Sequence, residues 1–198
     1  PNAIRVTVKN LTLKNANITA VNDGSNNAYD GGFIGRAYGT NVVENCTLEN
    51  SIVQGINKVG GIAGFQAENG ISIRKCTVKG STIKVDTENQ EYGQCGGILG
   101  YIGSVAAANE VSGNFIINTK VEAPANTNIG EEHRKSSICV GTLQGVKGQS
   151  LVIDMPFSYI QSSTFNGKTI DKTEYMGLLG GIRYEETQPS LTINGTRF

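Results

Sequence analysis

The sequence is poor in several residue types and patterns, and each shortage removes a class of protein. It has no tryptophan and only one histidine, His133, and no Cys-x-x-Cys pair accompanies it, so the sequence predicts no zinc site. Its 17 basic and 17 acidic residues cancel, which leaves no basic surplus for binding nucleic acid or an anionic membrane. Apolar runs are only a few residues long, so none would span a bilayer.

Proline is also scarce, with 4 residues, whereas glycine is abundant, with 26. This balance fits neither collagen nor a disordered linker. Together with many Asn, Thr, Val and Ile residues, it indicates short strands joined by tight turns, and helical spacing is almost absent. The sequence therefore predicts an all-β protein. Because the chain starts with Pro1 rather than methionine, we expect residues 1–198 to form a single domain trimmed from a longer protein.

The chain repeats itself. A glycine motif, consisting of glycine, two mostly apolar residues and glycine, recurs at intervals of about 29 to 44 residues. A second unit of the type Asn-Cys-Thr-Leu, seen at Asn45–Leu48 and in modified form at Lys75–Val78, follows the first copies. The copies of the glycine motif are Gly32–Gly35, Gly61–Gly64, Gly97–Gly100, a weak copy at Gly141–Gln144, and Gly177–Gly180.

Each repeat contains about three short strand-like segments, which in one unit are Gly61–Phe65, Ile71–Val78 and Thr82–Val85. Stacking identical units would pair each strand with its own copy one coil away. The fold expected is a right-handed parallel β-helix, a solenoid of about five coils. A propeller fragment or a β-sandwich is the alternative, although a propeller blade needs four strands.

The two signatures together resemble a known family. Gly60–Phe65 followed by Ile73–Gly80, and Gly31–Gly35 followed by Val43–Leu48, are similar to the GLUG motif of large bacterial surface and secreted proteins. The resemblance implies a right-handed parallel β-helix, an extracellular or cell-surface location, and an adhesive or scaffold role. It implies an architecture and names no ligand.

The four cysteines form two pairs by their position in the repeat. Cys46 and Cys76 share one position, and Cys95 and Cys139 each lie two residues before a motif glycine. We expect both pairs to be vertical neighbours and buried thiols, because parallel Cβ vectors nearly 5 Å apart fit a disulfide poorly. A disulfide in one pair, preferentially Cys95–Cys139, is the alternative.

Insertions recur before the glycine motif, at Val21–Asp30, Asp86–Gln94, Ala123–Ser137 and Lys168–Tyr175. In a solenoid they would lie along one edge, where binding residues usually gather. Tyrosine rings beside carboxylates could bind sugars by stacking and hydrogen bonding. The candidate ligand-binding residues are Tyr29, Asp30, Glu91, Tyr92, Glu174 and Tyr175.

The function expected is a non-catalytic extracellular or bacterial cell-surface module, adhesin-like or scaffold in kind, that binds glycan or a host surface protein through one edge. A flanking domain is a further expected partner. No catalytic, cofactor-binding or metal-binding residue is predicted. The alternatives are a polysaccharide lyase or glycoside hydrolase on a β-helix, which would need two suitably spaced carboxylates for hydrolysis, and a purely structural spacer.

Overall fold

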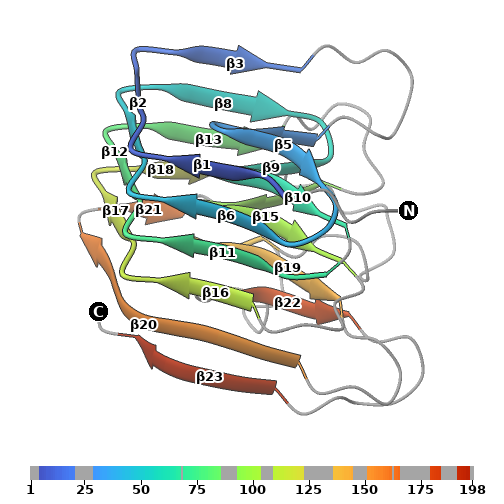
Figure 1. Cartoon of the computed structure of the whole chain (residues 1–198). Coiled ribbons are helices and arrows are strands. Elements are labelled where there is room, and N and C mark those ends of the chain that lie inside the picture. Colours follow the sequence, from blue (N-terminus) through green and yellow to red (C-terminus); the bar gives the residue numbers. More distant parts are fainter. Residues whose placement is uncertain are drawn as a thin grey trace.

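The chain winds into a right-handed parallel β-helix built only of short strands, as Figure 1 shows. The computed structural model describes residues 5–20, 29–67, 69–85, 93–103, 109–122, 136–144, 151–161, 163–165, 179–183 and 191–196. Every strand pairing in these ranges is parallel and joins a strand to its counterpart one coil away. The all-β solenoid predicted from the repeats is therefore confirmed.

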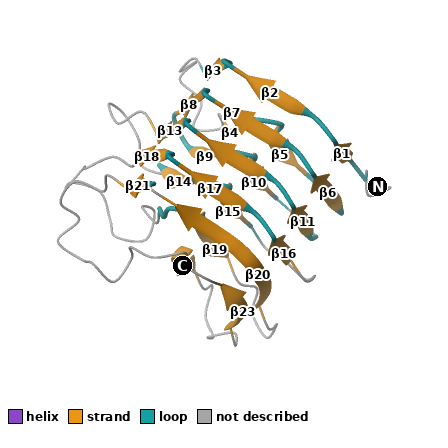
Figure 2. Cartoon of the chain, turned by 90° about the vertical axis from the view of Figure 1, so that its left-hand side faces the viewer, coloured by secondary structure: helices purple, strands orange, loops and turns teal. Residues whose placement is uncertain are grey.

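The strands stack into five ladders, here called A to E in the order in which one coil meets them (Figure 2). Ladder A contains β1 (Thr7–Lys9), β6 (Asn41–Glu44), β11 (Ile71–Arg74), β16 (Asn109–Ser112), β20 (Leu151–Gln161) and β23 (Leu191–Thr196). Ladder B contains β2 (Thr12–Lys14), β7 (Thr47–Glu49), β12 (Thr77–Lys79), β17 (Phe115–Ile117) and the second half of β20. Ladder C contains β3 (Asn17–Thr19), β8 (Ile52–Gly55), β13 (Thr82–Val85), β18 (Lys120–Glu122) and β21 (Thr164–Phe165).

Ladders D and E carry the residues around the glycine motif. Ladder D contains β4 (Tyr29–Gly31), β9 (Lys58–Gly60) and β14 (Gln94–Gly96). Ladder E contains β5 (Ile34–Ala37), β10 (Ala63–Gln66), β15 (Leu99–Ile102), β19 (Val140–Gln144) and β22 (Leu179–Arg183). The five strands of ladder E correspond to the five glycine-motif copies in the sequence.

A full coil has five short strands, whereas the sequence predicted three short strands per coil. The segment 71–78 is divided into β11 and β12 because Lys75 has a φ of 56°, a left-handed conformation that turns the chain. The same corner carries Asn10, Asn45 and Gly113 in the other coils, all with positive φ. Asparagine and glycine tolerate this conformation best, which explains the Asn-Cys-Thr unit of the repeat.

The glycine motif marks a close approach between stacked backbones. A Cβ atom on Gly61 would lie 2.1 Å from the carbonyl oxygen of Gly97, so no side chain fits there. The amide of Phe33 donates to the carbonyl of Ile62, and the amide of Ile62 donates to that of Ile98, at 3.1 and 2.9 Å. The first three motif copies are thus direct vertical neighbours, as the sequence predicted.

The fourth motif copy was placed three residues out of phase by the sequence reading. In the structure Leu99 pairs with Val140, so Gly141 stacks on Gly100, the last glycine of the motif. The position of the first motif glycine is taken by Ile138, whose carbonyl accepts from the amide of Gly97. Gly141–Gln144 therefore resembles the glycine motif in sequence but does not align with the other copies in the stacked coils.

This shift also corrects the second cysteine pair. The amide of Ile98 donates to the carbonyl of Cys139, whereas Cys95 lies beside Ser136, so the two cysteines do not share a repeat position. Both are buried free thiols, and desolvation raises the pKa of Cys139 to about 12. A thiol held in its neutral form is a packing residue rather than a nucleophile.

Cys46 and Cys76 do stack as vertical neighbours, at the corner between ladders A and B. The thiol of Cys76 donates weakly to the carbonyl of Val43, 3.7 Å away in the preceding coil. In the next coil Asn114 takes this position, and its amide donates to the carbonyl of Ile73 at 2.8 Å. Desolvation raises the pKa of Cys76 to about 12, so this pair also serves packing and corner hydrogen bonding.

The core runs up the centre of the solenoid as ladders of inward-facing aliphatic side chains. In the central coil Ile73, Val78 and Ile83 are completely buried. Each such side chain contributes roughly 1.5–3 kcal/mol relative to an exposed one. Their counterparts in the first coil are only partly buried, which leaves that end of the core more open; they are Val8, Leu13 and Ile18.

Candidate functional site

The structure separates the two predicted binding residues that it describes. Tyr29 and Asp30 are consecutive in β4, and successive side chains of a strand point to opposite faces. Asp30 stacks on Val59 and Cys95, both fully buried, so it faces inward, whereas Tyr29 lies among aromatic side chains outside. The other four predicted residues, Glu91, Tyr92, Glu174 and Tyr175, lie outside the described residues, as does His133.

The insertions share one attachment edge. The first three leave after β3, β13 and β18, which are stacked in ladder C, and the first two re-enter at β4 and β14 of ladder D. In the coil between them, β8 is joined to β9 by only Ile56 and Asn57. The chain ends that carry the insertions are therefore aligned along one edge, while the inserted residues themselves lie mostly outside the described ranges.

Directly beside this edge, the outward side of ladders D and E carries a cluster of four aromatic rings and two cations. Two rows of the repeat build it. The first row is Tyr29, Lys58 and Gln94, and the second is Arg36, Phe65 and Tyr101. The aromatic–cation cluster is defined as Tyr29, Arg36, Tyr38, Lys58, Phe65 and Tyr101.

Lys58 is held at the centre of three rings. Its Nζ lies 4.9 Å from the centroid of Tyr29, 5.1 Å from that of Phe65 and 4.9 Å from that of Tyr101. The rings also contact one another, with centroids 4.9 Å apart for Tyr29 and Phe65 and 5.3 Å apart for Phe65 and Tyr101. Cation–π attraction of about 0.5–2 kcal/mol for each good contact orders this part of the cluster from within.

Arg36 is the outer cation of the cluster. Its guanidinium carbon lies 5.0, 4.7 and 5.4 Å from the ring centroids of Tyr29, Tyr38 and Phe65. The side chain is exposed, and it forms no hydrogen bond or ion pair with any residue that the structure describes. Ring contacts therefore position a guanidinium whose N–H donors stay available to a ligand.

Asp30 lies inside the coil beneath this cluster. Its Oδ2 atom is buried and has no hydrogen-bond partner among the described residues, and a Cβ on Gly55 would lie 2.1 Å from it. Desolvation by burial raises the pKa of Asp30 to about 6. A glycine at position 55 thus makes room for a carboxyl group at a core position that is apolar in the next two coils.

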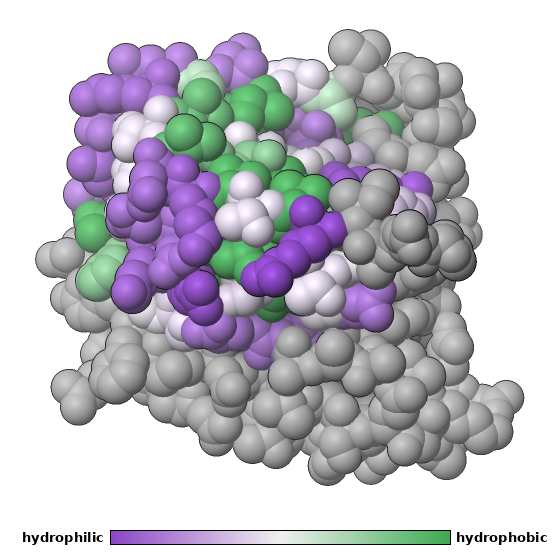
Figure 3. Space-filling view, in the orientation of Figure 1, coloured by the Kyte–Doolittle hydropathy of each residue, from purple (hydrophilic) through white to green (hydrophobic). Residues whose placement is uncertain are grey.

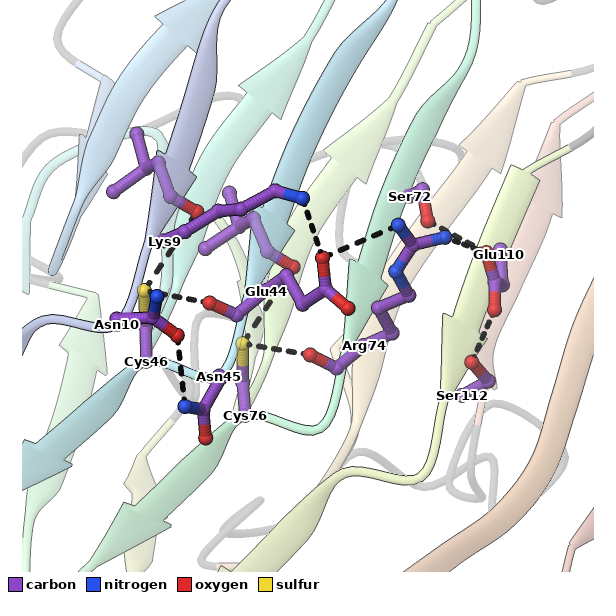
Figure 4. A network of polar contacts seen from close by, with 12 residues as sticks. Lys9, Asn10, Glu44, Asn45, Cys46, Ser72, Arg74, Cys76, Glu110 and Ser112 are labelled. Carbon is purple, nitrogen blue, oxygen red and sulfur yellow. Dashed lines mark hydrogen bonds and ion pairs between the residues drawn. The ribbon is translucent and has the colours of Figure 1, made fainter.

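The outward side of ladders A and B is different in kind, and Figure 4 shows part of it. Glu44 accepts from Lys9 at 2.8 Å and from Arg74 at 3.2 Å, so one carboxylate joins three coils. Arg74 reaches on to Glu110 at 3.7 Å, and the hydroxyl of Ser72 donates to Glu110 at 2.6 Å. We call these side chains, with Lys14, Glu49 and Lys79 of ladder B, the ion-pair face.

Charge pairing on the ion-pair face lowers the pKa of two of its carboxyl groups. Hydrogen bonds from Lys9 and Arg74 lower the pKa of Glu44 to about 2. Desolvation acts to raise the pKa of Glu49, but hydrogen bonds from Lys14 and Lys79 outweigh it and the pKa is lowered. Glu44 and Glu49 are thus held ionised by cations of the neighbouring coils.

A hollow of about 410 Å³ adjoins the aromatic–cation cluster at β5, the first strand of ladder E in the described residues. Its lining is mainly apolar, and Figure 3 shows green apolar side chains on this side of the molecule, in the region of β1, β5 and β6, with purple hydrophilic ones around them. The lining residues are Val6, Val8, Phe33, Ile34, Gly35, Arg36, Ala37 and Tyr38.

Most of this site was missed by the sequence reading, which looked for tyrosines in the insertions. A usable signal was present in the register of the repeat. Arg36, Phe65 and Tyr101 each follow the last glycine of a motif copy, and Lys58 stands where Tyr29 stands, three residues before the first glycine. Large outward side chains at one repeat position of adjacent coils must contact each other.

Comparison with known proteins returned no family model, no curated protein and no solved structure that matches this chain. The resemblance to GLUG-motif proteins therefore stays a prediction. Within the described ranges, no group of His, Cys, Asp or Glu side chains could hold a metal ion. The same ranges contain no helix of the length and apolarity that crossing a membrane would require.

Proposed function

We propose that this protein is a non-catalytic recognition module of an extracellular or cell-surface protein, adhesin-like in kind, and that it binds glycan through the aromatic–cation cluster. The observation that carries the proposal is the cluster itself. Four rings and two cations are gathered on the outer face of a parallel sheet, beside the edge where the insertions attach.

The chemistry of the cluster suits carbohydrate. Aromatic side chains offer apolar faces together with a polar hydroxyl group in the case of tyrosine, which matches the mixed surface of a sugar ring. Tyr38 is 47% exposed and lies at the outer rim beside Arg36, so its ring edge and free face can meet a ligand. The backbone beneath is fixed by pairing to the next coil, which keeps these groups pre-organised.

A catalytic role is less well supported. Glycoside hydrolysis needs a pair of carboxyl groups about 5–10 Å apart across the scissile bond. The aromatic–cation cluster contributes no carboxylate, and Asp30, whose pKa is raised to about 6, faces the interior of the coil. The structural-spacer alternative predicts instead that no glycan binds at all.

A glycan microarray probed with the wild-type protein tests the proposal. Tyr38→Ala should abolish or strongly reduce the signal, because it removes the exposed ring at the rim. Phe115→Ala is the matched control, since Phe115 is an exposed aromatic residue, 41% accessible, on ladder B. The glycan recovered after binding should be unchanged in length. A blank array supports the spacer, and shortened glycan supports an enzyme.

A further inference from the structure

The hollow beside β5 has two chemically distinct parts. Its floor is aliphatic and aromatic, formed by Val6, Val8, Phe33, Ile34 and Ala37. Its lining also includes Arg36 and Tyr38, which are both exposed. A concave, mainly apolar surface with a few fixed polar groups is the usual anatomy of a small-molecule site, and a volume of about 410 Å³ falls within the range of such sites.

Arg36 is prepared for a planar anion. A guanidinium has five N–H donors in a fixed fork that matches the two oxygens of a carboxylate. Contacts with the rings of Tyr29, Tyr38 and Phe65 hold the group in place. The donors along its edge have no partner among the described residues, in contrast to Arg74, which contacts both Glu44 and Glu110.

We propose that this hollow is a subsite for an acidic N-acetylated sugar, with the sugar carboxylate on Arg36 and the acetamido methyl group on the apolar floor. The inference rests on the proposed glycan-binding function and names the unit recognised. Tyr38, exposed at the rim, would lie against the pyranose ring. Each of the three features of the ligand thus has one complementary feature of the hollow.

The composition of the hollow favours one class of sugar over the others. A neutral sugar would leave the guanidinium without an anion, and a simple uronic acid would leave the floor without an apolar group. Val6 is 39% exposed, so part of this apolar lining is open to solvent and gains from being covered. A sugar that carries both a carboxylate and an acetamido group satisfies both parts.

Isothermal titration calorimetry with four soluble probes tests the assignment. N-acetylmuramic acid and N-acetylneuraminic acid carry both groups, and they separate a cell-wall source of the ligand from an animal-glycan source. N-acetylglucosamine lacks the carboxylate, and glucuronic acid lacks the acetamido group. At least one of the two acidic N-acetylated sugars should bind about tenfold or more tightly than either of the other two.

Variants of the two arginines locate the binding. Arg36→Gln should weaken binding of the acidic sugar about ten- to hundredfold, since a charged hydrogen-bonded pair is lost, and should weaken binding of N-acetylglucosamine by a much smaller factor. Arg36→Lys should recover part of the affinity, because it restores the charge without the fork. Arg74→Gln, which removes an arginine from the ion-pair face, should change nothing.

The outcomes separate this inference from the proposed function. Equal weakening by Arg36→Gln and Arg74→Gln, or equal binding of all four probes, overturns the acidic-sugar subsite. A protein that still gives a Tyr38-dependent microarray signal in that case keeps its glycan-binding function. Absence of any glycan binding overturns both, and circular dichroism of each variant shows whether the β-helix is retained.

Discussion

The ion-pair face and the aromatic–cation cluster are built by the same repeat and use their cations in opposite ways. On the ion-pair face Glu44 joins Lys9 and Arg74, so positive and negative side chains alternate from coil to coil. In the cluster Arg36 lies over aromatic rings, and Lys58 lies among three rings and donates to the side-chain oxygen of Asn57 at 3.2 Å. Both arrangements tie adjacent coils together, but only the cluster leaves a guanidinium edge exposed to solvent, since the unpartnered Nε atom of Arg74 is buried.

This difference suggests that the two surfaces have different roles. Paired surface charges satisfy one another and present little specific chemistry to a ligand. A cation placed over a ring keeps its charge and its donors, because the ring attracts it without consuming an N–H group. The ion-pair face is therefore best understood as structural, and the cluster as the side of the solenoid that can recognise another molecule.

The largest expected effect on stability comes from removing the ring at the centre of the cluster. Phe65→Ala deletes contacts with Tyr29, Tyr101 and both cations, and we expect a loss of about 2 kcal/mol, below the value for a fully buried phenylalanine because Phe65 is partly exposed. Urea unfolding measures it. Phe115→Ala should cost well under half as much, and equal losses would show that the cluster adds nothing to stability.

The next effect is on the pH dependence of stability, where Asp30, beneath the cluster, and the ion-pair face act in opposite directions. The pKa of Asp30 is raised to about 6, so between pH 7 and about 4 the folded state binds more protons than the unfolded state. Stability should therefore rise on acidification, by about 1 kcal/mol once solvent screening of this half-buried group is allowed for. Thermal unfolding of Asp30→Asn should show no such rise.

The ion-pair face should respond in the other direction. The pKa of Glu44 is lowered to about 2, so its contribution is complete above its unfolded value of 4.5 and is lost as the pH falls toward 2. Glu44→Gln should flatten this acid limb and leave the rise that depends on Asp30 intact. If Glu44→Gln altered the rise between pH 7 and 5, the assignment of the two limbs would be wrong.

A smaller gain is expected at one corner of the ion-pair face. Lys75 has a φ of 56°, where the first two coils have asparagine and the next has glycine. Lys75→Asn should stabilise the fold by about 0.5 kcal/mol, because asparagine tolerates the left-handed conformation better than lysine. Lys84→Asn, in the extended strand β13, should not stabilise and is the matched control for urea unfolding.

The smallest effect expected is that of salt. High salt should weaken the exposed ion pairs and lower the urea midpoint slightly, because these charges are open to screening. Glu44→Gln should reduce that sensitivity, and Phe65→Ala should leave it unchanged. A salt response that depended on Phe65 and not on Glu44 would reverse the roles assigned to the two regions.

The sequence predicted the fold well, because the glycine motif, the Asn-Cys-Thr unit and the alternating apolar residues repeat in register. Its error at Gly141 has a physical cause. Backbone stacking decides the register, and Ile138 occupies the position where earlier copies have the first motif glycine. The prediction, which relied on glycines alone, therefore assigned Gly141 to the wrong position of the repeat.

The candidate site was predicted only at Tyr29. Arg36 and Tyr38 follow a motif glycine and gave no sign of a site while each coil was read separately. Of the rings that contact Arg36, Tyr29 and Tyr38 belong to its own coil, and Phe65 is its vertical neighbour in β10. Contacts between coils depend on register, and loop lengths in the sequence obscure it.

The most direct test compares the two arginines in one spectrum. In ¹H–¹⁵N correlation spectra of the arginine side chains, titration with whichever acidic N-acetylated sugar binds more tightly should shift the Nε–H signal of Arg36. The Nε–H signal of Arg74 should stay in place, because that atom is buried behind the ion pairs that the terminal nitrogens of Arg74 form with Glu44 and Glu110. If both signals move together, or if only that of Arg74 moves, the distinction between a self-satisfied face and a recognition face is contradicted.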